Sequence, residues 1–239
     1  SVSAAPVDFL DWRMVVVTTD ITERKRAEQA HERATKRLRV LAEASRAFAE
    51  SNVDLGGVLD RIVTITAEVL GDGCAVSLVS DDGLWLKQLA VYDTDSERLR
   101  LLHEHNEHPQ PLDAPLAGPR IAQTGQPIVL PVVDHEQFRA SVRPESRALW
   151  DQLAFHSMLG VPMRVQNRSI GVLTLFRHRP EQRPFGEDDL LLAQELADRA
   201  ALAIHNARLF QHAQSEIAER ERAQKATDLL HVAGQLLAR

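Results

Sequence analysis

The chain has 239 residues, of which 44% are hydrophobic and 26% charged, and its formal net charge is −6 at pH 7. This composition is typical of a soluble globular protein, and a negative charge without a basic stripe argues against nucleic-acid binding. No apolar run reaches the roughly 20 residues that a membrane-spanning helix needs, so we expect no membrane contact. A single cysteine, Cys74, excludes an internal disulfide and favours a reducing, cytoplasmic location.

The N-terminal segment joins a strand pattern to a long helix pattern. Residues 12–18 (WRMVVVT) have the β-branched run of a strand. Asp20 stands three residues before Glu23, which is the spacing of a helix capping box. From there to Ser51 the pattern is helical, and a heptad seam predicts a coiled coil; the seam residues are Ala27, Ala30, Ala34, Leu41, Ala44 and Phe48. Because the chain begins at Ser1 and soon enters a strand, we expect it to be a piece of a longer protein.

The central region alternates helices and hairpins. Asp82-Gly83 and the segment 166–168 (QNR) mark hairpin turns, and four prolines between 109 and 119 predict short helices and loop over 93–126. The other predicted elements are a helix over 55–70, strands over 74–79, 84–92, 127–133, 157–165 and 169–178, a short helix over 144–154, and a last helix from 187 without a breaker before Gly234. Antiparallel hairpins with segregated helices indicate an α+β fold.

Nearly the same phrase occurs close to both ends of the chain. Residues 20–28 (DITERKRAE) align with residues 216–224 (EIAERERAQ), and later matches shift by seven residues, which is one heptad. We interpret both copies as helical connectors between domains, the first beginning a helix and the second continuing one. In both copies an Ile precedes a seam Ala by six residues, where an unbroken heptad needs seven. We expect this phase break to convert the state of a domain into helix movement.

Residues 15–28 (VVVTTDITERKRAE) resemble the closing strand and Asp-Ile-Thr exit motif of a PAS sensor domain. Residues 157–180 (SMLGVPMRVQNRSIGVLTLFRHRP) and 184–210 (PFGEDDLLLAQELADRAALAIHNARLF), with 54–83 before them, resemble a GAF domain. The resemblance implies a modular sensor of bacterial signalling, either a sensor histidine kinase, a diguanylate cyclase or a phosphatase. The predicted boundaries are 1–20 for the final strand of a truncated PAS domain, 21–52 for the first connector, 53–213 for the GAF domain and 214–239 for the second connector.

Six residues are candidates for a ligand pocket. Four lie in or beside segments that cover the sheet of a GAF domain, and two belong to a histidine-rich run in its middle segment; they are Tyr92, Trp150, Phe155 and His156, then His103 and His108. Ordinary core packing is the alternative for the first four, and a solvated face for the two histidines. The run 103–108 (HEHNEH) has metal-ligand residue types, but no second group of defined spacing accompanies it, so no metal site is predicted. The cofactor stays unknown.

Two ligands known for GAF domains are not expected here. Bilin-binding members attach the bilin through a cysteine in the middle region, which this sequence lacks; we interpret Cys74 as a buried core residue. Cyclic-nucleotide-binding members carry an Asn-Lys…Phe…Asp-Glu signature. Phe185 and Asp189 match its Phe and Asp, but Leu190 replaces the Glu, and Arg and His residues at 177–179 replace Asn-Lys.

No catalytic apparatus is recognisable, because the sequence lacks a phosphate loop, a nucleophile elbow, a kinase His box around His231 and the Gly-Gly-acidic signature of diguanylate cyclases. We therefore predict a sensory and signal-relay segment that senses a small ligand and is not itself an enzyme. We expect a parallel homodimer through the terminal helices, with a seam at Ala193, Leu196, Ala200, Ala203, Ala207 and Phe210. The alternatives are a dimerisation spacer that binds nothing and an enzyme with an unrecognised active site.

Overall fold

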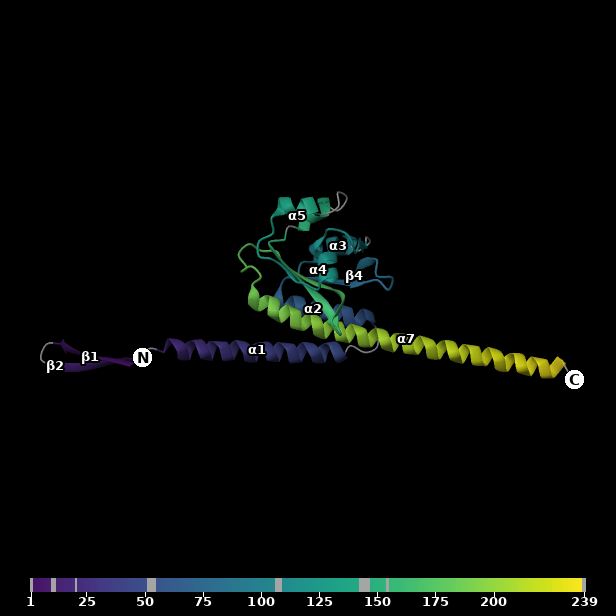
Figure 1. Ribbon diagram of the computed structural model, residues 1–239, viewed down its shortest axis with the longest axis horizontal. Helices are drawn as coiled ribbons and strands as arrows, with labels where there is room; N and C mark the ends of the chain where they lie inside the picture. Colours follow the sequence, from purple (N-terminus) through teal and green to yellow (C-terminus); the bar gives the residue numbers. More distant parts are fainter. Residues whose placement is uncertain are drawn as a thin grey trace. The chain divides into compact units, whose positions relative to one another are not determined.

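The computed structural model describes residues 2–9, 12–19, 21–50, 55–105, 109–141, 147–153 and 155–237. The chain divides into two compact units, residues 1–42 and 43–239. Figure 1 labels most of the helices and some of the strands. Among the described residues, no helix combines the length and the apolar character that crossing a membrane requires.

The first unit contains a β-hairpin and most of a long helix. β1 (Val2–Phe9) pairs antiparallel with β2 (Trp12–Thr19) in a two-stranded sheet. β2 confirms the strand predicted over 12–18, whereas β1 was not predicted, because its Ser, Ala and Pro residues give a weak strand signal. Pro6 is tolerated since each strand of a two-stranded sheet is an edge strand. α1 (Thr22–Glu50) follows, and its predicted cap, Asp20, lies outside the described residues.

The second unit is built on a six-stranded antiparallel sheet with the order β5-β4-β3-β8-β7-β6. Both hairpins predicted for this region are present, and they join through the pairing of β3 with β8. The predicted α+β fold is therefore confirmed. The strands are β3 (Gly73–Val79), β4 (Trp85–Asp93), β5 (Gln110–Pro111), β6 (Ile128–Leu130), β7 (Ser157–Val165) and β8 (Arg168–Arg177).

The hairpin of β7 and β8 turns at Gln166 and Asn167, whose φ angles are 50° and 64°. Two consecutive positive φ angles are a feature of the type I′ turn, whose twist matches that of the flanking strands. Val165 pairs with Arg168 directly across this turn. The tight turn predicted at 166–168 is therefore confirmed.

One face of the sheet is covered by α2 (Leu55–Leu70) and the first part of α7 (Glu187–Leu237), which lie side by side in Figure 1. Cys74 and Val76 of β3 are fully buried on this face. α7 presents small side chains to the sheet, and Ala197 and Ala201 have no exposed surface. Small residues let a helix approach a neighbouring element closely, so α7 lies close to the sheet at these positions.

This packing corrects part of the predicted dimer seam. Ala193, Leu196 and Ala200 are fully buried within one chain, so they cannot contact the helix of a second chain. The sequence could not reveal this, because a helix that packs on its own sheet repeats apolar residues at the same spacing of three and four. The exposed large apolar residues of α7 instead include Leu191, Leu202, Leu209, Phe210 and Ile217.

α7 is a single helix of 51 residues that begins in the second unit's core layer and runs through the second copy of the repeated phrase. The prediction that the second connector continues a helix is thus confirmed. Its first turn carries Glu187, Asp188 and Asp189, which complement the positive end of the helix dipole.

In the described part of the chain, the opposite face of the sheet is covered by the short helices α3, α4, α5 and α6, and Figure 1 labels α3, α4 and α5 on that side. α3 (Ser96–His105) and α4 (Ala117–Thr124) confirm the short helices predicted over 93–126, and α6 (Arg147–Leu153) confirms the one predicted over 144–154. α5 (His135–Ser141) was not predicted, since its seven residues are too few to show helical periodicity. The strand predicted over 127–133 is real but shorter, with three residues in β6.

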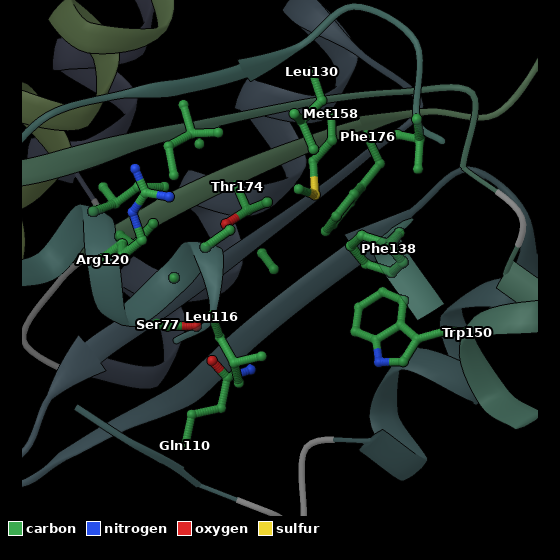
Figure 2. Close-up of a pocket in the computed structure, with 18 of the residues that line it drawn as sticks. Ser77, Gln110, Leu116, Arg120, Leu130, Phe138, Trp150, Met158, Thr174 and Phe176 are labelled. Carbon is green, nitrogen blue, oxygen red and sulfur yellow. The ribbon is translucent and has the colours of Figure 1, made fainter. Parts of the chain in front are cut away.

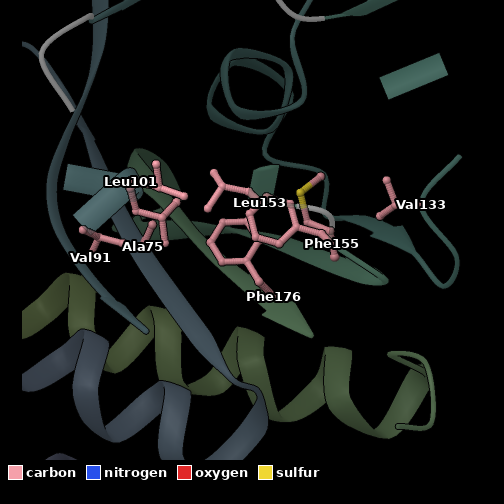
Figure 3. Close-up of a cluster of buried hydrophobic side chains, with 9 residues drawn as sticks. Ala75, Val91, Leu101, Val133, Leu153, Phe155 and Phe176 are labelled. Atoms are coloured by element: carbon pink, nitrogen blue, oxygen red, sulfur yellow. The ribbon is translucent and has the colours of Figure 1, made fainter. Parts of the chain in front are cut away.

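A hydrophobic cluster fills the space between the sheet and these short helices (Figure 3). Its residues come from the four strands β3, β4, β7 and β8, from α3 and α6, and from the loops beside them. Phe155 and Phe176 are the largest side chains in the cluster, and both are at most 3% exposed. The other members are Ala75, Val91, Leu101, Leu102, Val133, Leu153 and Met158.

Candidate functional site

A cavity of about 460 Å³ lies on the sheet face that the short helices cover (Figure 2). This volume is within the range of small-molecule binding sites, roughly 300–1,000 Å³. Alternate residues of a strand point to the same face of a sheet, and alternate residues of five strands form the floor. These floor residues are Ala75 and Ser77 of β3, Leu86 and Gln88 of β4, Ile128 and Leu130 of β6, Met158 and Gly160 of β7, and Val172, Thr174 and Phe176 of β8.

A β-bulge decides which residues of β4 reach the cavity. Ser77 pairs with Gln88, whereas the preceding Val76 pairs with Ala90, so Leu89 is an additional residue in β4. Beyond the bulge the alternation of β4 is therefore reversed. Residues that pair directly share a face of the sheet, so Tyr92, which pairs with Cys74, lies on the face that α2 and α7 cover.

The roof of the cavity comes from the start of α4, the segment between β6 and α5, and the helices α5 and α6. Ile121 of α4 packs where the sheet has no side chain, because a Cβ added at Gly160 would lie 2.5 Å from Ile121 Cδ1. α4 ends at Gly125 in the left-handed conformation, with φ of 65°. The close approach of Ile121 to the sheet at Gly160 thus fixes the height of α4 above the floor.

Two charged side chains, Arg120 and Asp134, belong to the described lining. Asp134 Oδ1 accepts hydrogen bonds from the backbone N–H groups of Glu136 (3.0 Å) and Gln137 (3.1 Å), so its carboxylate caps α5. The guanidinium of Arg120 is exposed, and no other side chain in the described part of the chain pairs with it. Among the described lining residues, Arg120 is therefore the charged side chain that is available to bind a ligand.

Gln88 adds an unusual donor to the floor. Its Nε2 is buried without a hydrogen-bond partner among the described residues. A buried donor that lacks an acceptor costs about 1–3 kcal/mol. An acceptor atom on a bound molecule would remove this penalty, so the position favours a ligand with a hydrogen-bond acceptor.

Aromatic side chains form the other end of the cavity. Phe138 and Trp150 meet edge to face with ring centroids 5.1 Å apart, and both line the cavity. Behind them, Trp150 contacts Phe155 at 5.4 Å, and Phe155 stacks on Phe176 at 4.3 Å. Figure 2 shows Phe138 and Trp150 together at one end and Arg120 at the other, with Ser77 and Thr174 between them.

A buried polar group adjoins this aromatic series. The ring of His178 lies 5.7 Å from that of Phe155, and its Nε2 is 2.7 Å from Asp93 Oδ2. The side chain of Asp93 is fully buried. Arg98 of α3 lies over Phe155, with Cζ 5.4 Å from the ring centroid, and burial lowers the pKa of its guanidinium. The aromatic series therefore connects the cavity to buried charges at the ends of β4 and β8.

Asp72, which follows α2, extends this polar group. Its carboxylate accepts hydrogen bonds from the backbone N–H of His178 (3.0 Å), from Gln182 Nε2 (2.9 Å) and from Arg179 (3.3 Å). Burial by itself raises the pKa of Asp72. These hydrogen bonds and the nearby positive charges lower the pKa by a larger amount, so it lies below its ordinary value. Asp72 is therefore held as a carboxylate that fixes the chain after β8.

The residues at the cyclic-nucleotide signature positions form a structural ion cluster. Arg177 donates to Asp189 at 3.3–3.4 Å and to the backbone carbonyl of Leu70 at 2.7 Å, while its guanidinium stacks on Phe185 with Cζ 4.0 Å from the centroid. Asp189 also accepts from Arg183 at 2.8 Å. Phe185 is buried, as its interpretation as a core residue requires. These contacts tie β8 to the end of α2 and the start of α7.

The six predicted pocket residues lie in different places. Trp150 lines the cavity, and Phe155 is buried directly behind it. His156 is half-buried and bridges strands through its backbone, donating to the Arg177 carbonyl and accepting from the Val133 N–H. Tyr92 faces α2 and α7, His103 is exposed on α3, and His108 lies outside the described residues.

The sequence reasoning did not single out Arg120, Gln88, Ser77 or Thr174. Ser77 and Thr174 carried a usable signal, since each is a polar residue inside an otherwise apolar strand, GCAVSLV and GVLTLF. A polar side chain in such a strand needs a partner or a cavity. Arg120 and Gln88 carried no comparable signal, because one lies on a short helix and the other just before a bulge.

Cys74 is fully buried, and burial raises the pKa of its thiol, which confirms its interpretation as a core residue. Within the described ranges, no three His, Cys, Asp or Glu side chains are grouped as a metal site would require.

Comparisons with known proteins agree with this fold. The model of the GAF domain family matches residues 54–204. Two similar solved structures are the GAF domains of phosphoenolpyruvate-protein phosphotransferases. That from Acinetobacter has a TM-score of 0.56 and 21% identity over 72% of this chain and 94% of that chain. That from Coxiella burnetii has a TM-score of 0.58 and 19% identity over 74% and 96%. The free methionine-R-sulfoxide reductase from Neisseria meningitidis has a TM-score of 0.52 and 19% identity over 71% and 89%. At these identities the likeness concerns the fold alone.

Proposed function

The chain belongs to the GAF domain family, and we propose that it is a sensory and signal-relay segment of a bacterial signalling protein. In this proposal the cavity binds a small molecule, and α7 carries the resulting change to an effector domain. The observation that carries it is the cavity itself, which is roomy, partly polar and bordered by an aromatic wall. We assign the parent protein to the sensor histidine kinases, with a diguanylate cyclase or phosphatase as the second choice, and the hairpin β1–β2 to the end of a PAS domain.

The relay rests on contacts that join the two faces of the sheet. Thr174 and Phe176 of β8 line the cavity, and the next residue, Arg177, holds the carbonyl of Leu70 at the end of α2 and the carboxylate of Asp189 near the start of α7. A ligand that moves β8 therefore acts on both helices of the opposite face. Since α7 is continuous to Leu237, a rotation or tilt at its start reaches its far end.

The relay also assumes a parallel homodimer through the terminal helices. The exposed leucines Leu202 and Leu209 of α7 are seven residues apart, which suits such a seam. Sedimentation should therefore give a dimer at tens of micromolar. The double variant Leu202→Glu, Leu209→Glu should be monomeric, and Gln214→Glu, an exposed control that lies about 120° around the same helix from Leu202, should remain dimeric. A monomeric wild-type chain would contradict this part of the proposal.

The rival function is a spacer whose cavity stays empty. Native mass spectrometry of the protein purified from its source tests the choice, because a sensor retains a small molecule that can be identified by its mass. Thr174→Phe places an aromatic ring in the centre of the cavity and should abolish retention. Lys87→Phe, an equal change at an exposed position of β4, should not. No retained molecule in any form of the protein would favour the spacer.

The proposal assigns no catalytic activity to this segment. Incubation with labelled ATP or GTP should give neither a phosphorylated chain nor a cyclic dinucleotide. Labelled phosphate on His231 or on any other residue would contradict this.

A further inference from the structure

The chemistry of the cavity lining narrows the class of ligand. We propose that the cavity binds a small monocarboxylate with an aromatic ring, in which Arg120 and Gln88 hold the carboxylate and the wall of Phe138 and Trp150 holds the ring. This inference rests on the proposed sensory function and adds the ligand class to it.

The anionic group of the proposed ligand is inferred from the two charged residues of the described lining, Asp134 and Arg120. Asp134 already accepts two backbone hydrogen bonds as the cap of α5, while the guanidinium of Arg120 is without a side-chain partner in the described part of the chain. A guanidinium binds a carboxylate through two parallel hydrogen bonds. The buried Nε2 of Gln88 is a further donor in need of an acceptor, which a carboxylate oxygen supplies.

The charged residues of the lining also indicate that the ligand carries a single negative charge. Among the described lining residues, one is cationic and one is anionic, so their charges sum to zero. A dianion such as a phosphate monoester would carry one negative charge more than Arg120 neutralises, and the other charged lining residue, Asp134, would repel that charge. A monoanion is matched by Arg120 alone.

The aromatic ring of the proposed ligand is inferred from the end of the cavity opposite Arg120. Phe138 and Trp150 meet at an angle of 81°, so together they form a corner into which the edge of a flat ring fits. Aromatic rings prefer such edge-to-face or offset arrangements. Met158 and Leu130 complete this end with apolar surface. Figure 2 places this corner across the cavity from Arg120, so one molecule spanning the cavity can meet both.

Isothermal titration calorimetry of the full chain tests the inference with three probes that share one ring. They are 3-phenylpropionate, its neutral amide 3-phenylpropionamide, and phenyl phosphate. We expect the carboxylate to bind at least tenfold tighter than the amide, which is about 1.4 kcal/mol, and tighter than the phosphate. Arg120→Gln should reduce the carboxylate-to-amide ratio to near one. Arg168→Gln removes an exposed arginine outside the cavity and should keep the ratio.

Three results would overturn the inference: an unchanged ratio in Arg120→Gln, tighter binding of phenyl phosphate, or no binding of 3-phenylpropionate. The mass-spectrometric experiment separates this failure from failure of the sensory function. A retained molecule that Thr174→Phe abolishes, together with no carboxylate binding, leaves the sensor intact and refutes the ligand class. If the protein retains no molecule and also binds no carboxylate, both the sensory function and the ligand class are refuted.

Discussion

Asp189→Asn tests the idea that the signature-position residues hold the fold together. The side chain of Asp189 is 4% exposed and that of Arg177 is 10% exposed, and Asp189 also accepts from Arg183 and from the backbone N–H of Gly186. The substitution keeps the shape of the side chain but removes its charge, which leaves Arg177 buried without a counter-charge. Removing one partner of a buried pair costs about 3–5 kcal/mol. Since an asparagine oxygen still accepts hydrogen bonds, we expect the lower end, about 3 kcal/mol.

Urea denaturation gives the free energy of unfolding, and thermal melts should show a fall in Tm of about 6–12 °C for a domain of this size. Asp198→Asn is the matched control. Asp198 lies on the same helix and pairs with Arg164, but these side chains are 38% and 40% exposed, so the loss should be at most about 1 kcal/mol. If the two variants lose the same stability within about 0.5 kcal/mol, the buried cluster does not stabilise the fold in the way its burial suggests.

Three further predictions concern the thiol, an aspartate and the connector. The raised pKa of Cys74 means that the folded state keeps its proton where the unfolded state loses it, so above about pH 9 the wild type should lose stability with rising pH more steeply than Cys74→Ala, as urea titrations will show. The lowered pKa of Asp72 acts in the opposite direction: its stabilisation is present above the ordinary aspartate pKa and should disappear as pH falls below about 4, a loss that Asp72→Asn should flatten in acid denaturation curves. One residue inserted after Ile217 should lock the output of the parent protein in one state, whereas removal of one heptad from residues 27–48 should leave regulation intact; the reverse pattern in an output assay would refute the phase-break hypothesis.

The strands and their turns could be predicted because local sequence determines them. Two consecutive positive φ angles at Gln166 and Asn167 need residues that tolerate them, and two largely apolar strands flank the turn. α5 could not be predicted, because seven residues cannot show a period of 3.6. The face of β4 that carries Tyr92 could not be predicted either, since the bulge after Gln88 is visible only in the pairing with β3.

The candidate site depended on tertiary structure to a greater degree. Trp150 and Phe155 were found as aromatics near the sheet, but the sequence could not tell which of them faces the cavity and which lies behind. Arg120 is ordinary on a short helix until the fold places it opposite an aromatic corner. The dimer seam predicted for α7 was wrong at Ala193, Leu196 and Ala200 for a related reason. Periodicity in the sequence shows that one face of a helix is apolar, but it does not show which element covers that face.

β8 explains how one strand serves both the cavity and the helices. Alternation sends Thr174 and Phe176 to the cavity and Leu173 and Leu175 to the helical layer, and all four positions follow from the period of two. At the end of the strand the same alternation acts on charged residues. Arg177 turns to the helical layer and binds the end of α2 and the start of α7, while the adjacent His178 binds Asp93 and contacts Phe155 behind the cavity wall. In the proposed relay, a displacement of Phe155 by a ligand at Trp150 therefore has a route of contacts to both helices, through His178 just after β8 and Arg177 at its end. The Asn-Lys of the cyclic-nucleotide signature would fall at 177–178 or at 178–179, and in this chain Arg177, His178 and Arg179 all make structural contacts at the exit of the sheet.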